Sequence, residues 1–261
     1  MGNLVEYRVD NGIAIFELNN PPANSYTYDL LHEFDEAICQ ARMDDNVHVL
    51  VVRGKGEKFF CAGADINMLG GKSTSYRYHF ALYGQEVLLR LEHTPKLIIA
   101  AINGHAVGGG LEIAMACDLR IAKKDGGRLG LAEVNLGLLP GMGGTQRLPR
   151  LVGRGRAMEL TCSGRTIIFE EALEIGLVNH IYESENFFDQ VLAYAKQFAA
   201  PNKASFSVGK IKRAIHVGLE TSLDEGLAFE REVLFQTYQS EDSAEGLDAY
   251  LKKRQAKFKG A

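Results

Sequence analysis

The sequence contains no tryptophan, only four cysteines and no long hydrophobic run. Its longest strongly apolar run, residues 97–102, is far shorter than the roughly 20 residues that a membrane-spanning helix needs. The cysteines form no CxxC pair and are far apart: Cys39, Cys61, Cys117 and Cys162. We therefore expect a cytoplasmic protein with reduced, mostly buried thiols and no secretory signal.

The sequence also lacks a large excess of charge of either sign, because it has 29 lysines and arginines and 33 aspartates and glutamates, for a net charge of −4. This balance gives no general attraction to nucleic-acid phosphates or to anionic lipid, so we expect neither as a partner. A local basic run lies between leucines and is expected on a solvated or subunit-facing surface: Arg147, Arg150, Arg154 and Arg156.

The common motifs of cofactor and metal sites are missing. Gly71-Lys72-Ser73 resembles the end of a phosphate-binding loop, but the first glycine of that motif would fall on Ile66. Three other glycine clusters lack the third glycine of a dinucleotide site, and the seven histidines form no HExxH motif. We expect no metal ion and no separate cofactor.

What the sequence does contain is an alternation of strand and helix patterns. Asp10-Asn11-Gly12 separates two β-rich runs at residues 4–9 and 13–18, which is a strong hairpin signal. Apolar residues then follow helical spacing over residues 28–43, and residues 47–52 are typical of a strand buried on both faces. Further expected elements are helices at 76–92 and 110–116 and strands at 96–102 and 119–122. The pattern predicts an α/β fold with crossover connections.

The last quarter of the chain is predicted to be helical, over residues 187–198, 202–218, 221–239 and 243–256. Its apolar stripes exceed what so short a bundle can bury, so we expect an oligomer. We divide the chain into a core of residues 1–200 and a helical C-terminal region of residues 201–261.

Three segments are hard to explain by packing alone: residues 59–67, 102–118 and 129–148. In the second, a buried strand ends in Asn-Gly, and three glycines precede a short apolar helix. Such a run leaves free backbone N–H groups at a helix start, and glycine lets a ligand approach them closely. The first segment adds a small-residue turn, Ala62-Gly63-Ala64, after a strand that is expected to be parallel to the second. Two N–H groups could converge there as an oxyanion hole.

Two glutamates accompany these turns. Glu112 lies one turn into the short helix, among Leu111, Ile113 and Ala114, where a lone carboxylate is costly to bury. Glu133 lies in a similar setting beside Leu131 and glycines. Two carboxylates beside an oxyanion hole suit general acid–base chemistry next to a polarised carbonyl.

The three segments together resemble the enoyl-CoA hydratase/isomerase family, also called the crotonase superfamily. The resemblance rests on AGAD at residues 62–65, GGG-x-E at 108–112 and PG-x-GGTQRL at 140–148, in this order and spacing. It implies a spiral of ββα units with a C-terminal α-helical region that forms trimers, and a homotrimer or a hexamer made as a dimer of trimers. It also implies an acyl-CoA thioester substrate, of which coenzyme A is a part, and a role in fatty acid metabolism such as β-oxidation.

Carried over to this sequence, the resemblance implies an oxyanion hole made by the amides of Ala64 and Gly109. It places the two acids of the hydratases on Glu112 and Glu133. Because both are present, the expected reaction is the addition of water to 2-trans-enoyl-CoA, with Glu112 activating the water and Glu133 giving a proton to C2. The further expected substrate-binding residues are Ala62, Asp65, Ile66, Lys58 and Lys253, with Lys253 reaching a neighbouring subunit's site.

Other functions on the same scaffold remain open at this point. A double-bond isomerase, a lyase or a hydrolase acting on CoA esters would need only one of the acids. An RNA-binding branch of the family uses a lysine-rich helix, but here residues 74–93 carry only Arg77 and Arg90 as cations. An aromatic-rich stretch in the same segment is expected to be packing core rather than acyl tunnel: Tyr76, Tyr78, Phe80, Leu82 and Tyr83.

Overall fold

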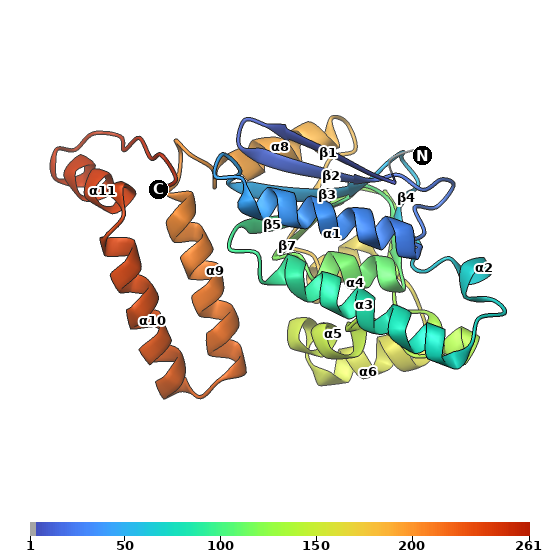
Figure 1. Cartoon of the computed structure of the whole chain (residues 1–261). Coiled ribbons are helices and arrows are strands. Elements are labelled where there is room, and N and C mark those ends of the chain that lie inside the picture. The colour runs from blue at the N-terminus through green and yellow to red at the C-terminus, as the bar shows by residue number, and fades with distance from the viewer. Residues whose placement is uncertain (1–3) are drawn as a thin grey trace.

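A computed structural model describes residues 4–261 and shows a six-stranded sheet with the strand order β1-β2-β3-β5-β7-β10 (Figure 1). Its strands are β1 (Val5–Asp10), β2 (Ile13–Leu18), β3 (Val49–Gly54), β5 (Leu97–Ile102), β7 (Leu119–Lys123) and β10 (His180–Tyr182). The first two form the predicted antiparallel hairpin, in which Asn11 and Gly12 both have positive φ. The other neighbours in the sheet are parallel, as the alternation of strands and helices predicts.

A second, four-stranded sheet was not expected from the sequence. Its order is β4-β6-β8-β9, and its strands are β4 (Phe59–Cys61), β6 (His105–Val107), β8 (Arg128–Gly130) and β9 (Ile167–Ile168). In three successive units, a strand of the large sheet leads directly into a short strand of the small one and then to helical structure. This repeat is the spiral of ββα units that the family resemblance implies.

Helices cover both faces of the large sheet. Alternate side chains of its strands point to a larger core that contains Phe34 and Leu88, and to a smaller core that contains Val191. In these regular strands, period-two alternation separates the two cores. The helices of this part are α1 (Tyr28–Met43), α2 (Ile66–Leu69), α3 (Thr74–Glu92), α4 (Gly109–Met115), α5 (Gly144–Val152), α6 (Arg154–Ser163), α7 (Phe169–Glu174) and α8 (Phe187–Lys196), with a 3₁₀ turn η1 (Glu133–Leu136).

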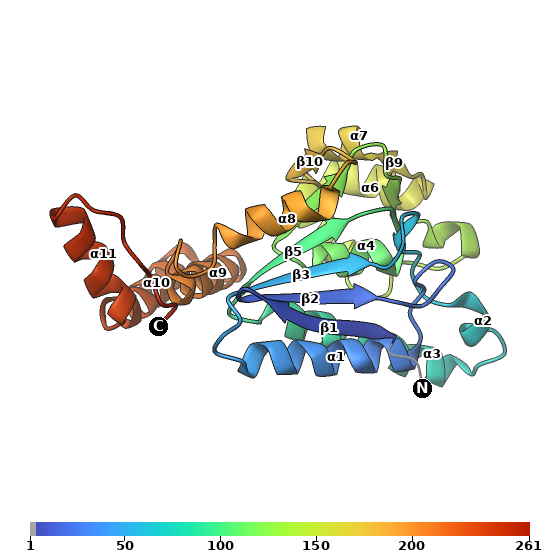
Figure 2. The same ribbon diagram turned by 90° about the horizontal axis from the view of Figure 1, so that it is seen from above.

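The C-terminal helices α9 (Ser205–Glu220), α10 (Leu223–Tyr238) and α11 (Glu241–Leu251) lie to one side of the sheets (Figures 1 and 2). The last helix ends five residues before the expected boundary. Lys253 adopts a left-handed conformation with φ 53°, and the Arg254 amide donates to the carbonyl of Ala249 and closes the helix. The chain then returns toward the start of α11, where Asp242 accepts hydrogen bonds from the amides of Lys259 and Gly260.

Two expectations about burial are wrong in part. Of the aromatic stretch in α3, Phe80 is buried, whereas Tyr76, Tyr78 and Leu82 are exposed, because the buried face of this helix continues through residues 84, 87, 88 and 91. The four cysteines are free, but the thiol of Cys162 near the end of α6 is exposed rather than buried.

Candidate active site

The small-residue turn after β4 lies directly against the glycine-rich turn after β6. The two strands are parallel neighbours, and Cys61 pairs with Ala106. Gly63 has φ 89°, and a Cβ placed on it would lie 3.1 Å from the Val107 carbonyl and 3.2 Å from the Gly109 nitrogen. Glycine is required here because a side chain would separate the two turns.

The amides of Ala64 and Gly109 are free donors of these turns. One neighbour of each is used: the Asp65 amide donates to the Tyr26 carbonyl, and the Gly108 amide donates to the Gly130 carbonyl. Within residues 4–261, the amides of Ala64 and Gly109 donate to no other group. Two unpaired N–H groups on touching turns are the donor arrangement of an oxyanion hole.

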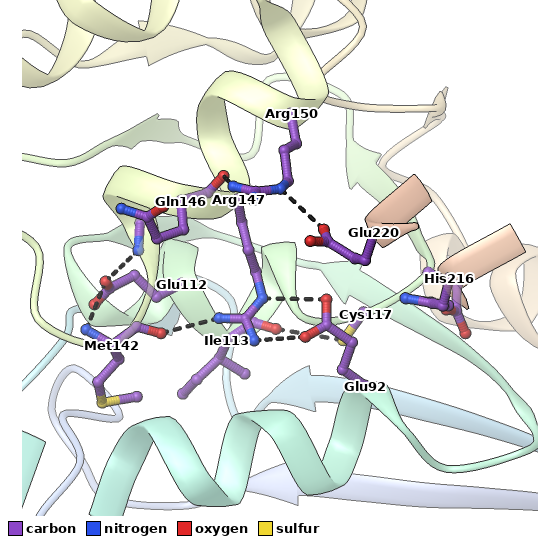
Figure 3. A network of polar contacts seen from close by, with 12 residues as sticks. Glu92, Glu112, Ile113, Cys117, Met142, Gln146, Arg147, Arg150, His216 and Glu220 are labelled. Carbon is purple, nitrogen blue, oxygen red and sulfur yellow. Dashed lines mark hydrogen bonds and ion pairs between the residues drawn. The ribbon is translucent and has the colours of Figure 1, made fainter. Parts of the chain in front are cut away.

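Glu112 lies in the first turn of α4 with 1% of its surface exposed. Its Oε1 atom accepts a hydrogen bond of 2.7 Å from the Met142 amide (Figure 3) and another of 2.7 Å from the Gly144 amide. Burial raises the pKa of its carboxyl group from 4.5 to about 7. The nearby charge of Glu133 acts in the same direction, while the two amides and the Arg147 guanidinium oppose it. A carboxyl group with a pKa near 7 can take up or release a proton at neutral pH.

The loop that holds Glu112 is itself fixed by Arg147 of α5. The Arg147 guanidinium donates to the Met142 carbonyl at 3.0 Å and pairs with Glu92 of α3 at 2.6 Å (Figure 3). Its side chain is only 13% exposed, so the expectation of a solvated or subunit-facing surface is wrong for this arginine. Arg150, one turn further on, forms an exposed pair with Glu220, as expected.

Glu133 begins η1 on the other side of the glycine-rich turn. A Cβ on Gly108 would lie 2.8 Å from its Oε1 atom, so the carboxylate lies against the residue that precedes Gly109. Its Oε2 atom is buried and has no hydrogen-bond partner in the described chain. Burial raises the pKa of this carboxyl group as well. A buried carboxyl oxygen without a partner, next to the glycine-rich turn, is free to form a hydrogen bond with a ligand.

The remaining predicted binding residues have other contacts in the structure or lie away from the two turns. Ala62 donates its amide to Ala23, and the Asp65 side chain caps α2 by accepting from the amide of Asn67. Ile66 is exposed at the start of that helix, and the Lys58 ammonium lies 5.6 Å from the centre of the Phe59 ring, just before β4. The structure does not bring Lys253 to this site, because it follows α11 at the opposite end of the molecule from α2 (Figures 1 and 2).

Some groups of the site were missed by sequence reasoning. The amides of Met142 and Gly144 belong to the PGMGG run, whose glycines signal close backbone approach, but the sequence does not say to which group. The ion pair of Arg147 and Glu92 joins helices more than fifty residues apart, and Tyr26 reaches the site from the segment before α1.

No cluster of three or more histidine, cysteine, aspartate or glutamate side chains in residues 4–261 is arranged to hold a metal ion. Over the same residues, no helix is both long and apolar enough to cross a membrane.

Comparison with known proteins gives one consistent result. A sequence model of the enoyl-CoA hydratase/isomerase family matches residues 8–261. A probable enoyl-CoA hydratase of Bacillus subtilis is 39% identical, over 99% of each chain. A short-chain-enoyl-CoA hydratase of Clostridium acetobutylicum is 39% identical, over 97% of this chain and 96% of its own. The solved structure of an enoyl-CoA hydratase from Geobacillus kaustophilus superposes with a TM-score of 0.97 at 40% identity, covering 100% of this chain and 98% of the other.

Proposed function

The chain belongs to the enoyl-CoA hydratase/isomerase family, and we propose that it adds water across the 2-trans double bond of an enoyl-CoA thioester to give 3-hydroxyacyl-CoA. The relatives that match nearly the whole chain carry hydratase names, and the protein is an enzyme with hydratase activity. The observation that carries the proposal is the pairing of two carboxylates, the buried Glu112 and the half-buried Glu133, with two unused backbone amides.

The amides of Ala64 and Gly109 would bind the thioester carbonyl oxygen. When water adds at C3, negative charge moves onto this oxygen, and donors that are already in place stabilise it without reorganising. Each such donor contributes about 3 kcal/mol to transition-state binding in a water-excluded site. Polarisation of the carbonyl also draws electrons from C3, which makes that carbon open to attack.

The two glutamates would transfer the protons. At the start the pair carries one proton, which is on Glu133. Glu112 has its Oε1 atom fixed by two amides, which leaves Oε2 to orient a water molecule and take its proton. The hydroxide adds to C3, and Glu133 gives its own proton to C2. Glu112 ends the step protonated, the state that its burial favours, and exchange through water returns the proton to Glu133.

Coenzyme A enters as part of the substrate, so the reaction needs no separate cofactor. Its phosphates require local cations, because the protein has a net negative charge. Lys58 lies just before β4, near the turn that holds Ala64, and is proposed to contact the coenzyme A portion. Lys253 is proposed to serve the site of a neighbouring subunit.

A homotrimer, or a hexamer made of two trimers, is proposed from the exposed apolar side chains of the C-terminal helices. One stripe follows the i, i+4, i+8 spacing of α9 and is largely exposed in the single chain: Ile211, Ile215 and Leu219. A cytoplasmic location and a role in fatty acid β-oxidation complete the proposal.

The direct test is whether the purified protein hydrates crotonyl-CoA and longer 2-trans-enoyl-CoA thioesters. The reaction is monitored by the loss of absorbance of the conjugated enoyl thioester. We expect turnover that falls by about 10²- to 10⁴-fold in Glu112→Gln and in Glu133→Gln separately. Glu86→Gln, at an exposed position of α3, is the matched control and should keep full activity. No water addition to any of these thioesters would reject the proposal, and full hydratase activity after loss of one acid would reject the paired mechanism.

A further inference from the structure

The backbone of Tyr26 is hydrogen-bonded to the turn that carries one of the two oxyanion donors. It lies just before α1, and its backbone forms an isolated parallel bridge with Ala64. Its amide donates to the Gly63 carbonyl at 2.9 Å, and its own carbonyl accepts from the Asp65 amide at 3.0 Å. These two bonds fix the position of Tyr26 relative to the Ala64 amide.

The side chain of Tyr26 extends from this turn to the other donor. A methyl group built on Gly109 would collide with the Tyr26 hydroxyl, so the hydroxyl occupies the space beside the Gly109 Cα atom. The tyrosine is only 4% exposed, and its ring stacks on Phe80 with the centroids 6.0 Å apart. A single rigid side chain therefore connects the two halves of the oxyanion hole.

The Tyr26 hydroxyl is nevertheless unused by the protein. It makes no hydrogen bond to any group in residues 4–261, although the residue is almost completely buried. Unlike the hydroxyl of Tyr7, this oxygen is not sealed from solvent, so a ligand can reach it. Burial raises the pKa of the phenol well above 10, and the charges of Glu112, Cys61 and Glu133 add to this effect. The group therefore stays protonated and can donate.

We propose that Tyr26 is a further catalytic residue, whose hydroxyl donates a third hydrogen bond to the thioester oxygen held by the amides of Ala64 and Gly109. The carbonyl oxygen of the bound thioester accepts this third bond weakly, and the enolate oxygen that forms during hydration accepts it strongly. The bond therefore strengthens as the reaction proceeds, and it acts on kcat more than on substrate binding. The inference rests on the proposed hydration of a thioester at this site.

Tyr26→Phe removes the hydroxyl and keeps the ring on Phe80. We expect kcat on crotonyl-CoA to fall by about 10- to 100-fold with little change in KM. The absorption band of a bound, conjugated enoyl-CoA shifts to the red when its carbonyl is polarised, and this shift should be smaller in the variant. Tyr7→Phe is the matched control, because it removes a tyrosine hydroxyl that has no hydrogen-bond partner but lies on β1. It should change neither quantity.

The red shift separates a contact with the carbonyl from a structural role. A folded Tyr26→Phe protein with an unchanged red shift would overturn the inference, whatever its kcat. The proposed function would still stand in that case if the unsubstituted protein hydrates crotonyl-CoA. Absence of both hydration and red shift in the unsubstituted protein would overturn both. Where Tyr26→Phe fails to fold, 3-fluorotyrosine at position 26, a stronger donor of similar size, should increase the red shift, and an unchanged shift would contradict the inference.

Discussion

The Oε1 atom of Glu112 accepts a hydrogen bond of 2.7 Å from the backbone amide of Gly144. This contact joins the first turn of α4 to the first residue of α5, two helices that the sequence separates by a strand pair and a 3₁₀ turn. It fixes one carboxylate oxygen and so determines where the other can place a water molecule. A Cβ on Gly144 would lie 3.0 Å from this oxygen, which explains a glycine at this position.

Burial of Glu112 should make the stability of the protein depend on pH. The carboxyl group has a pKa of 4.5 when exposed and about 7 in the folded protein, so the native state binds its proton more tightly. Stability from this group is complete below pH 4.5 and is lost as the pH rises through 7. Glu112→Gln should therefore be more stable than the unsubstituted protein at pH 8, by up to about 3 kcal/mol, with no difference at pH 4.5.

Urea unfolding at pH 8 and pH 4.5 measures this difference, with Glu86→Gln as an exposed control. A Glu112→Gln protein that is less stable than the unsubstituted one at pH 8 would contradict the assigned cause of the pKa shift.

The rate of hydration should follow a bell-shaped pH profile. The active form carries one proton on the pair of Glu112 and Glu133, because one acid takes a proton while the other gives one. As the pH rises through about 7, the pair loses its last proton and kcat/KM should fall. At low pH both acids are protonated and kcat/KM should fall again. Initial rates on crotonyl-CoA between pH 5 and pH 9 test this, and a profile that stays flat across the range would argue against a shared proton.

Arg147 should support activity without touching substrate. Arg147→Met removes the bond to the Met142 carbonyl and a positive charge that lowers the pKa of Glu112. We expect kcat/KM to fall by about tenfold or more, since the Met142 amide shifts, and the alkaline limb of the pH profile to move to higher pH. Arg150→Met, which breaks the exposed pair with Glu220 and an exposed bond to the Gln146 carbonyl, is the matched control and should behave like the unsubstituted protein. A loss of stability without movement of the alkaline limb would show that Arg147 serves folding alone.

The apolar stripe of α9 should hold subunits together. Ile215 is 57% exposed in the single chain, and Ile215→Glu places a charge at the centre of the stripe. Light scattering after size-exclusion chromatography should show a trimer or hexamer for the unsubstituted protein and smaller species for the variant. Met43→Glu changes an 80% exposed apolar side chain at the end of α1 and should leave the assembly intact. A monomer in the unsubstituted protein would contradict the assignment of this surface.

The parts of the fold that could be predicted from sequence are those with local signals. Asp10-Asn11-Gly12 specifies its own hairpin, and the apolar spacing of residues 28–43 gives both ends of α1 correctly. The strands of the small sheet escaped prediction because each has only two or three residues, too few to show alternation. The early end of α11 depends on the left-handed Lys253, which no sequence pattern indicates.

The functional residues of the site also divide into those with a local sequence signal and those without one. Glu112 and Glu133 can be recognised in the sequence because acids are unexpected among apolar neighbours. The glycine runs indicate that the backbone comes close to another chain segment or to a ligand. Tyr26 carries no such signal, since its importance comes from contact with Gly109, more than eighty residues away. Tertiary contacts of this kind become visible only when the segments are placed in space.

The central claim is tested most directly by a crystal structure with a bound, unreactive acyl-CoA analogue. The account predicts that the thioester oxygen lies 2.7–3.1 Å from the amide nitrogens of both Ala64 and Gly109, with the carboxylates of Glu112 and Glu133 facing C2 and C3. A thioester oxygen bound away from these two amides, or either carboxylate turned away from the acyl group, would contradict it.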